Sequence, residues 1–244
     1  MDSFGLPWFV AVPLAAAVCF VFGLLFGWPS LRLKGHHLAL ATFALALATP
    51  QILKHRSVDS WTGGVQGVMV FMPPPPSWLP LGREGFTYAV VLLFFLVSFF
   101  AISALFRSRM GRAIVAVKEN PIAAASMGVD LTRVKLATFA ISCMVTGLAG
   151  ALYTLITEYV SPDSFSLMLS ILLLVGVVIG GAGTMLGPII GATFIQFVPR
   201  YAEQISQSAP SAIYALFLIA VVFFMPNGVV GFVSKVFGRL RPSG

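Results

Sequence analysis

The feature that most constrains this chain is a series of apolar segments, each about as long as a helix that crosses a bilayer. Four are clear, at residues 8–27, 38–53, 86–106 and 136–157. A hydrocarbon core about 30 Å thick requires about 20 helical residues, and lipid offers backbone groups no hydrogen-bond partner. Because 58% of the residues are hydrophobic and only 9% are charged, a soluble domain would expose too much apolar surface. The predicted fold class is an all-α, polytopic transmembrane helical bundle.

Two less regular stretches bring the number of hydrophobic segments to six or seven. Residues 166–199 are apolar but are interrupted by glycines and Pro188, which predicts two short helices with a break. They either cross the membrane twice or enter it and return. The last segment, residues 211–225, is short. Gly23 and Gly27 are four residues apart, a spacing that predicts close helix packing or a moving gate. Residues 1–244 are expected to form a single transmembrane domain.

The basic residues predict the orientation in the membrane. Lys and Arg are in excess on the cytoplasmic side of membrane proteins, and eleven of the fifteen fall inside if the segment 107–135 is cytoplasmic. The N-terminus is then external, the C-terminus cytoplasmic, and residues 54–85 form an external loop. Although the net charge is +7, the basic residues lie in clusters between apolar spans, so membrane lipid is an expected partner and nucleic acid is not.

The spans carry no obvious source of energy or chemistry. They contain no Asp, Glu, Lys or Arg, whereas proton-coupled carriers rely on such residues within the membrane. The run from Gly180 to Thr184 lacks the Lys-Ser/Thr of a phosphate-binding loop, and Cys19 and Cys143 lack the spacing of a metal site or disulfide framework. We therefore expect no enzyme activity, no catalytic or metal-binding residues and no cofactor on this chain, with any ATP bound by a partner subunit.

The segment 107–135 is the best candidate for contact with such a partner. Asn120 is placed to act as an N-cap with Pro121 at the first helical position, and Gly128 is placed as a left-handed stop. This predicts a short helix with alanines for close approach and with Ile122 and Met127 as apolar anchors. The alternative is an ordinary basic loop that obeys the positive-inside rule.

Two further groups of polar residues are candidates for function. Polar side chains within spans are candidates to line a translocation path; they are Thr42, Thr49, Gln51, Ser142, Thr146 and Gln196. For Ser142 and Thr146 the alternative is a hydrogen bond to a carbonyl of their own helix. The Thr49-Pro50 pair is expected either to interrupt its helix or simply to kink it. Glu158 and Asp163, in the loop after the fourth span, are candidates for docking of a binding protein, or are simply solvated carboxylates.

Five ordered motifs resemble the branched-chain amino acid permeases of ATP-binding-cassette importers, over nearly the whole chain. They are Arg32-Leu33-Lys34-Gly35, Thr62-Gly63-Gly64 with Gly67, the segment from Gly111-Arg112-Ala113 to Ala151, Gly180-Gly181 to Gly187-Pro188 with Gly191-Ala192, and Pro226-Asn227-Gly228 with Gly231. The resemblance implies that the helix at residues 119–128 couples to an ATPase. The residues assigned to coupling are Gly111, Arg112, Lys118, Glu119, Asn120, Ala123, Ala124, Ala125 and Gly128.

The same resemblance implies a function and a set of partners. The chain would be a permease subunit in a bacterial cytoplasmic (inner) membrane, importing branched-chain amino acids or similar amino acids and amides. Its partners would be two ATPase subunits, a second permease subunit and a periplasmic or lipid-anchored substrate-binding protein. The family usually has additional N-terminal helices, so we expect the start of this chain to be truncated or misassigned. The alternative is a reduced subunit that relies on its partner. The alternative function is a passive channel or secondary carrier for small polar solutes such as urea.

Overall fold

A computed structural model describes residues 8–30, 36–55, 63–70 and 82–205, together with residues 228 and 231. The chain divides into two compact units, Met1–Ser164 and Phe165–Gly244. Among the described residues, four helical segments are long and apolar enough to cross a membrane: Trp8–Pro29, Arg83–Arg107, Leu131–Thr157 and Pro162–Gly180. The predicted polytopic helical fold is therefore confirmed. The count of six or seven segments stays a prediction, since residues 211–225 lie outside the described part, and so does the single domain.

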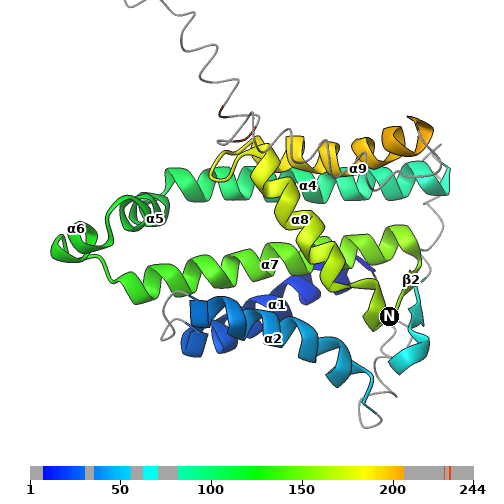
Figure 1. Cartoon of the computed structure of the whole chain (residues 1–244), viewed down its shortest axis with the longest axis horizontal. Coiled ribbons are helices and arrows are strands. Elements are labelled where there is room, and N and C mark those ends of the chain that lie inside the picture. Colours follow the sequence, from blue (N-terminus) through cyan, green and yellow to red (C-terminus); the bar gives the residue numbers. More distant parts are fainter. Residues whose placement is uncertain are drawn as a thin grey trace, which may run out of the picture. The chain divides into compact units, whose positions relative to one another are not determined.

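The first unit is built on the long helices α1 (Trp8–Ser30), α2 (His36–Leu53), α4 (Arg83–Arg107) and α7 (Leu131–Thr157). Helices α4 and α7 extend side by side between the two ends of the unit (Figure 1). The expected interruption of α2 at Thr49-Pro50 is wrong, because the helix continues through Pro50 to Leu53. Pro50 lies in the last turn of α2, where its missing backbone N–H removes one helical hydrogen bond without ending the helix.

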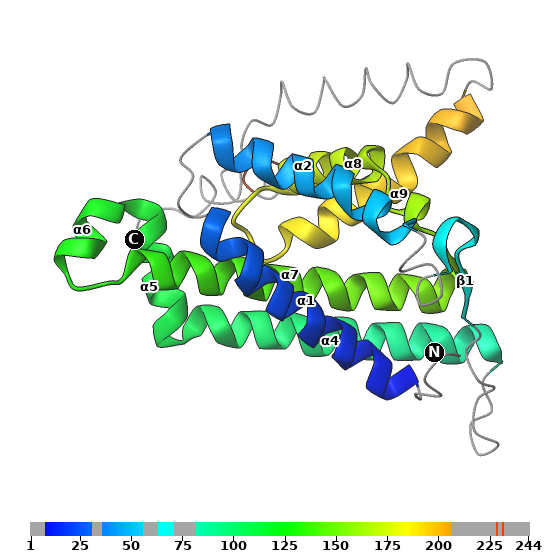
Figure 2. The ribbon, with the colours of Figure 1, turned by 90° about the horizontal axis from the view of Figure 1, so that it is seen from below.

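Helices α1 and α7 make the most intimate contact of this unit (Figure 2). A Cβ atom added to Gly23 would lie 2.9 Å from the Cβ atom of Cys143 and 2.9 Å from the Cα atom of Ala140. One added to Gly147 would lie 2.5 Å from the Cβ atom of Cys19. Each cysteine thus fills the space that a glycine leaves on the facing, antiparallel helix. The close packing predicted from the glycine spacing is confirmed on α1.

One end of the first unit combines an apolar cluster with a short strand pair. Val12, Leu152 and Leu155 are buried together with Val70, which follows β1 (Val68–Met69). This strand pairs antiparallel with β2 (Tyr159–Val160), and the single turns η1 (Gly64–Gln66) and η2 (Pro162–Ser164) flank the pair. The all-α prediction did not include this pairing. The described parts of the expected loop 54–85 are thereby attached to the end of α7.

The opposite end carries two short helices, α5 (Arg109–Glu119) and α6 (Pro121–Ser126). They pack against the start of α7 through Val117, Ala124 and Val134. Helix α7 begins five residues before the predicted start at residue 136, because Asp130 caps it: its Oδ1 atom accepts hydrogen bonds from the N–H groups of Thr132 at 3.0 Å and Arg133 at 3.1 Å. We call α5, α6 and the first turns of α7 the α5–α6 module.

The described part of the second unit is a helical hairpin. Helix α8 (Leu167–Gly180) and helix α9 (Gly187–Ile205) are separated by six residues, so the predicted pair of short helices with a break is confirmed. A Cβ atom added to Gly191 would collide with the carbonyl of Gly176, and one added to Gly180 would collide with that of Gly187. The two helices therefore cross at backbone contact.

Candidate functional site

Helix α6 has the local structure that its sequence predicts. The Oδ1 atom of Asn120 accepts hydrogen bonds from the N–H groups of Ile122 and Ala123, each at 3.1 Å, and Pro121 occupies the first helical position. At the other end Gly128 has a φ of 83°, and a Cβ atom there would meet nothing within 4 Å. Glycine is required at this position for its backbone conformation alone. Both ends of this six-residue helix are thus fixed by its own sequence.

The α6 surface is apolar and strongly exposed. Ile122 is 80% exposed and Met127 is 85% exposed, and the side chains of Ala123 and Ala125 are exposed as well. Ala124 differs, since it is only 5% exposed and packs inside the α5–α6 module. The expectation that Ala124 faces a partner is therefore corrected by its burial. Two long apolar side chains remain in water at the tip, without a partner within the described residues.

Gly111 also has a role inside the chain. It is buried, and a Cβ atom there would collide with the carbonyl oxygen atoms of Leu105 and Phe106 at the end of α4. The Oγ atom of Ser108 caps α5 by accepting a hydrogen bond from the Gly111 N–H at 3.4 Å. Glycine therefore lets α5 turn back against α4, which is a different role from the expected contact with a partner.

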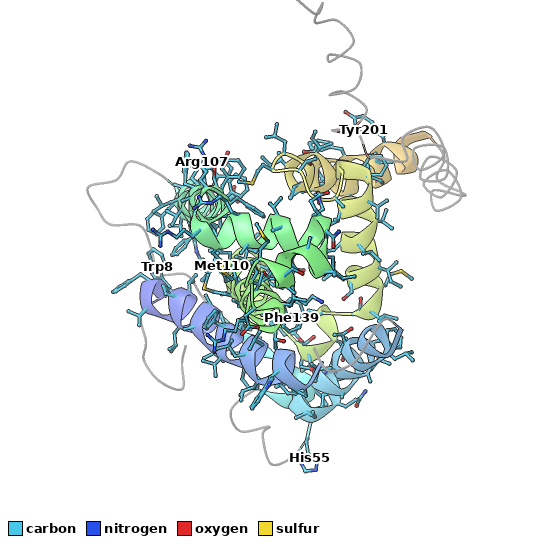
Figure 3. The ribbon with its side chains drawn as sticks, turned by 90° about the vertical axis from the view of Figure 1, so that its left-hand side faces the viewer. Trp8, His55, Arg107, Met110, Phe139 and Tyr201 are labelled. Atoms are coloured by element: carbon cyan, nitrogen blue, oxygen red, sulfur yellow. The ribbon has the colours of Figure 1, made fainter. Side chains whose placement is uncertain are left out.

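The charged members of the motif lie on the outside of the module. Arg112, Lys118 and Glu119 are exposed, and the Nη1 atom of Arg112 lies 3.4 Å from the carbonyl oxygen of Arg107. Figure 3 views the first unit from this end, which Arg107 and Met110 mark. The module end of the unit has six basic residues and two acidic ones between positions 107 and 135. Such an excess is typical of the cytoplasmic side of a membrane protein.

The opposite end of the first unit has a different charge balance. Its described residues include Lys54 and Arg83 as basic residues and Glu84, Glu158 and Asp163 as acidic ones. Two ion pairs form at this end. The Nζ atom of Lys54 lies 2.6 Å from the Oδ1 atom of Asp163, and the Nη2 atom of Arg83 lies 2.7 Å from the Oε1 atom of Glu158. The segments 54–85 and 107–135, which are predicted on opposite sides of the membrane, have their described residues at opposite ends of the folded unit.

Glu158 holds an unusual position at this end. It caps α7 with a φ of 57°, a left-handed conformation that is costly for a side chain other than glycine or asparagine. Its carbonyl oxygen accepts a hydrogen bond from the Val70 N–H at 2.8 Å, while its carboxylate pairs with Arg83. Since Glu158 and Asp163 each have a basic partner in this chain, their docking role stays a prediction.

Three of the six polar residues of the predicted path bond within their own helices. The hydroxyl of Ser142 donates to the Thr138 carbonyl at 3.0 Å, and that of Thr146 donates to the Ser142 carbonyl at 2.9 Å. The Thr49 hydroxyl donates to the Leu45 carbonyl at 2.7 Å. The alternative given for Ser142 and Thr146 is confirmed, and Thr49 bonds to its own helix in the same way. A path role stays a prediction for all six residues, which include the half-buried Thr42 and the exposed Gln51 and Gln196.

The comparison with known proteins decides the family. Residues 2–226 match the family described as "Branched-chain amino acid transport system / permease component". The chain belongs to this family. It is 33% identical over 250 residues to the high-affinity branched-chain amino acid transport system permease protein LivM of Salmonella typhimurium, and 32% identical over 250 residues to that of Escherichia coli. Each alignment covers 93% of this chain.

The relatives differ from this chain in length. The chain spans 58% of the two enterobacterial LivM proteins. The probable branched-chain amino acid transport permease protein LivM of Methanocaldococcus jannaschii is 25% identical over 237 residues, which are 91% of this chain and 67% of that protein. No solved structure matches the chain. Family membership therefore rests on the sequence, and the structure shows where the motif residues lie in the fold.

Proposed function

We propose that this chain is a permease subunit of an ATP-driven importer for branched-chain amino acids, or for similar small amino acids and amides. Family membership and the names of the relatives support this substrate class. The proposed partners are two ATPase subunits, a second permease subunit and a periplasmic or lipid-anchored substrate-binding protein. The α5–α6 module faces the cytoplasm of the bacterial inner membrane, in accord with its excess of basic residues.

The observation that carries the coupling proposal is the exposed apolar tip of the module. Ile122 and Met127 project from a helix whose ends are fixed by Asn120 and Gly128. Exposing two long apolar side chains is unfavourable unless a partner covers them, and an apolar groove on an ATPase subunit would do so. Small neighbours such as Ala125 let the partner surface approach the helix closely.

The module would transmit motion because it joins two membrane helices. It begins at the end of α4 and ends in the first turns of α7, and its buried residues Val117 and Val134 pack together with Ala124. A displacement of α6 by the ATPase therefore reaches both spans. ATP binding would bias a two-state equilibrium between outward and inward access, while this chain itself binds no nucleotide.

The test is an Ala125→Arg substitution in the complete complex. The arginine would place a charge in the apolar contact, so substrate-stimulated ATP hydrolysis should fall to the basal rate while membrane insertion is unchanged. Ala116→Arg on α5 is the matched control, since Ala116 is also exposed but lies off the α6 tip. Normal leucine uptake by the Ala125 variant would exclude docking at α6, and uptake without ATP would favour a passive channel or secondary carrier instead.

A further inference from the structure

The first turns of α4 and the last turn of α7 both lie at the end of the first unit opposite α6 (Figure 1). Side chains from these turns line a groove. Its volume is about 540 Å³. Its charged lining residues, Arg83, Glu84 and Glu158, come from the ends of the two helices, and its apolar ones, Val91, Leu155 and Ile156, come from positions farther along them. We call the charged end the mouth. We propose that this groove binds one phospholipid whose head group carries a primary ammonium beside its phosphate. The proposal rests on the chain being a membrane protein, and it is independent of transport and orientation.

The charges at the mouth are complementary to such a head group. Arg83 and Glu158 already form an ion pair at 2.7 Å, but their side chains are 48% and 39% exposed, and a guanidinium has five N–H donors. The guanidinium of Arg83 is thus half-exposed beside the groove, where its positive charge can attract a phosphate group. Glu84 is exposed and lines the same mouth, so two carboxylates are available to accept hydrogen bonds from an ammonium group.

The order of side chains along α4 matches a lipid molecule standing in a bilayer. Tyr88, which is 68% exposed, follows the charged mouth by one turn, where aromatic residues mark the membrane interface. Val91 lies nearly one turn deeper, next to Ile156 and Leu155 of α7. Val91 is about 12 Å along the helix from Arg83 at a rise of about 1.5 Å per residue. An acyl chain spans that distance, whereas a free amino acid occupies only the mouth.

The proposed recognition depends on the number of hydrogen-bond donors in the head group. A primary ammonium donates hydrogen bonds to the carboxylates of Glu84 and Glu158, whereas a choline head group has no N–H to donate. Phosphatidylglycerol has a phosphate for Arg83 but no cation, so the two carboxylates repel it. The groove should therefore prefer phosphatidylethanolamine to both.

The test uses the full chain, purified with its co-purifying subunits and exchanged into an equimolar mixture of the three lipids. Native mass spectrometry should show one retained phosphatidylethanolamine, favoured over phosphatidylcholine by about fivefold, as expected for a charge-assisted hydrogen bond in a half-exposed site. Glu84→Gln should abolish this preference, and Arg83→Gln should remove the bound lipid. The controls Asp163→Asn and Lys54→Gln change charges at the same end outside the groove and should leave retention unchanged.

Several results would overturn the proposal. Equal retention of all three lipids would mean adventitious lipid only, and stronger retention of phosphatidylglycerol would mean that the carboxylates play no part. Displacement of the lipid by millimolar leucine would assign the groove to a soluble amino acid. If Arg83→Gln fails to fold because its ion pair with Glu158 is lost, Glu84→Gln still decides, since Glu84 forms no ion pair within the described residues. A failed ATPase test at Ala125 would leave these results unaffected.

Discussion

The contact between α1 and α7 predicts opposite effects for two alanine substitutions on the same helix. In Gly147→Ala the new Cβ atom would lie 2.5 Å from the Cβ atom of Cys19 and 3.3 Å from the carbonyl oxygen of Ala15, whereas carbon atoms in contact are normally about 3.5–4.0 Å apart. Neither neighbouring atom can rotate away, so α1 must shift by about 1 Å. Such overpacking costs about 1–3 kcal/mol. Alanine regains about 0.5–1 kcal/mol over glycine in a helix, which leaves a net loss of about 1–2 kcal/mol.

Gly150→Ala is the matched control for this substitution. Gly150 lies three residues further along α7, and a Cβ atom there would meet nothing within 4 Å. Only the gain in helix propensity remains, so the free energy of unfolding should rise by up to about 1 kcal/mol. The assay is reversible unfolding of the full chain in mixed micelles by a denaturing detergent, followed by circular dichroism.

A double-mutant cycle tests the proposed cause. Cys19→Gly removes both side-chain atoms that the new methyl group would meet, so adding Gly147→Ala to that variant should cost little. The gain in helix propensity is the same in both backgrounds, so the interaction free energy between the two positions should equal the overpacking cost of about 1–3 kcal/mol. If Gly147→Ala and Gly150→Ala have the same effect, or if the cycle shows no interaction, the helices are not in contact through these residues.

The other two predictions concern a helix cap and the second unit. Asn120→Ala removes the acceptor for two N–H groups of α6 and should cost about 1 kcal/mol, seen as faster amide hydrogen exchange confined to the α5–α6 module; unchanged exchange would contradict the cap. Gly187→Ala would place a Cβ atom 2.5 Å from the Gly181 carbonyl oxygen, so it should separate α8 from α9 and lower the thermal midpoint by several degrees. A midpoint equal to that of the unsubstituted chain would rule out this close crossing.

Features that neighbouring residues determine were predictable from the sequence. Asn120, Pro121 and Gly128 determine the ends of α6 within a few residues, and the structure has these ends as expected. The start of α7 was missed although its signal is equally local. Asp130 is a good N-cap, but the prediction followed the apolar residues alone. These begin at residue 136, after the charged residues Arg133 and Lys135.

Features that depend on distant residues were not predictable. The spacing of Gly23 indicates a close neighbour but does not say that the neighbour is Cys143 of α7. Ala124 stands between two other alanines, and nothing in the sequence distinguishes it from them. It is buried only because it packs against Val117 in the folded module. The ion pair of Lys54 with Asp163 joins residues 109 positions apart, and no pattern in a single sequence indicates such pairing.

The length of α7 has a mechanical consequence. Its 27 residues extend about 40 Å, while a hydrocarbon core is about 30 Å thick, so about two turns stand clear of the lipid. Because an intact α-helix is stiff, these turns act as a lever arm: a sideways push on the free end tilts the whole rod about its crossing with α1. A push of a few ångströms at the membrane surface thereby becomes a change of angle deep in the bilayer, without any hinge in α7 itself.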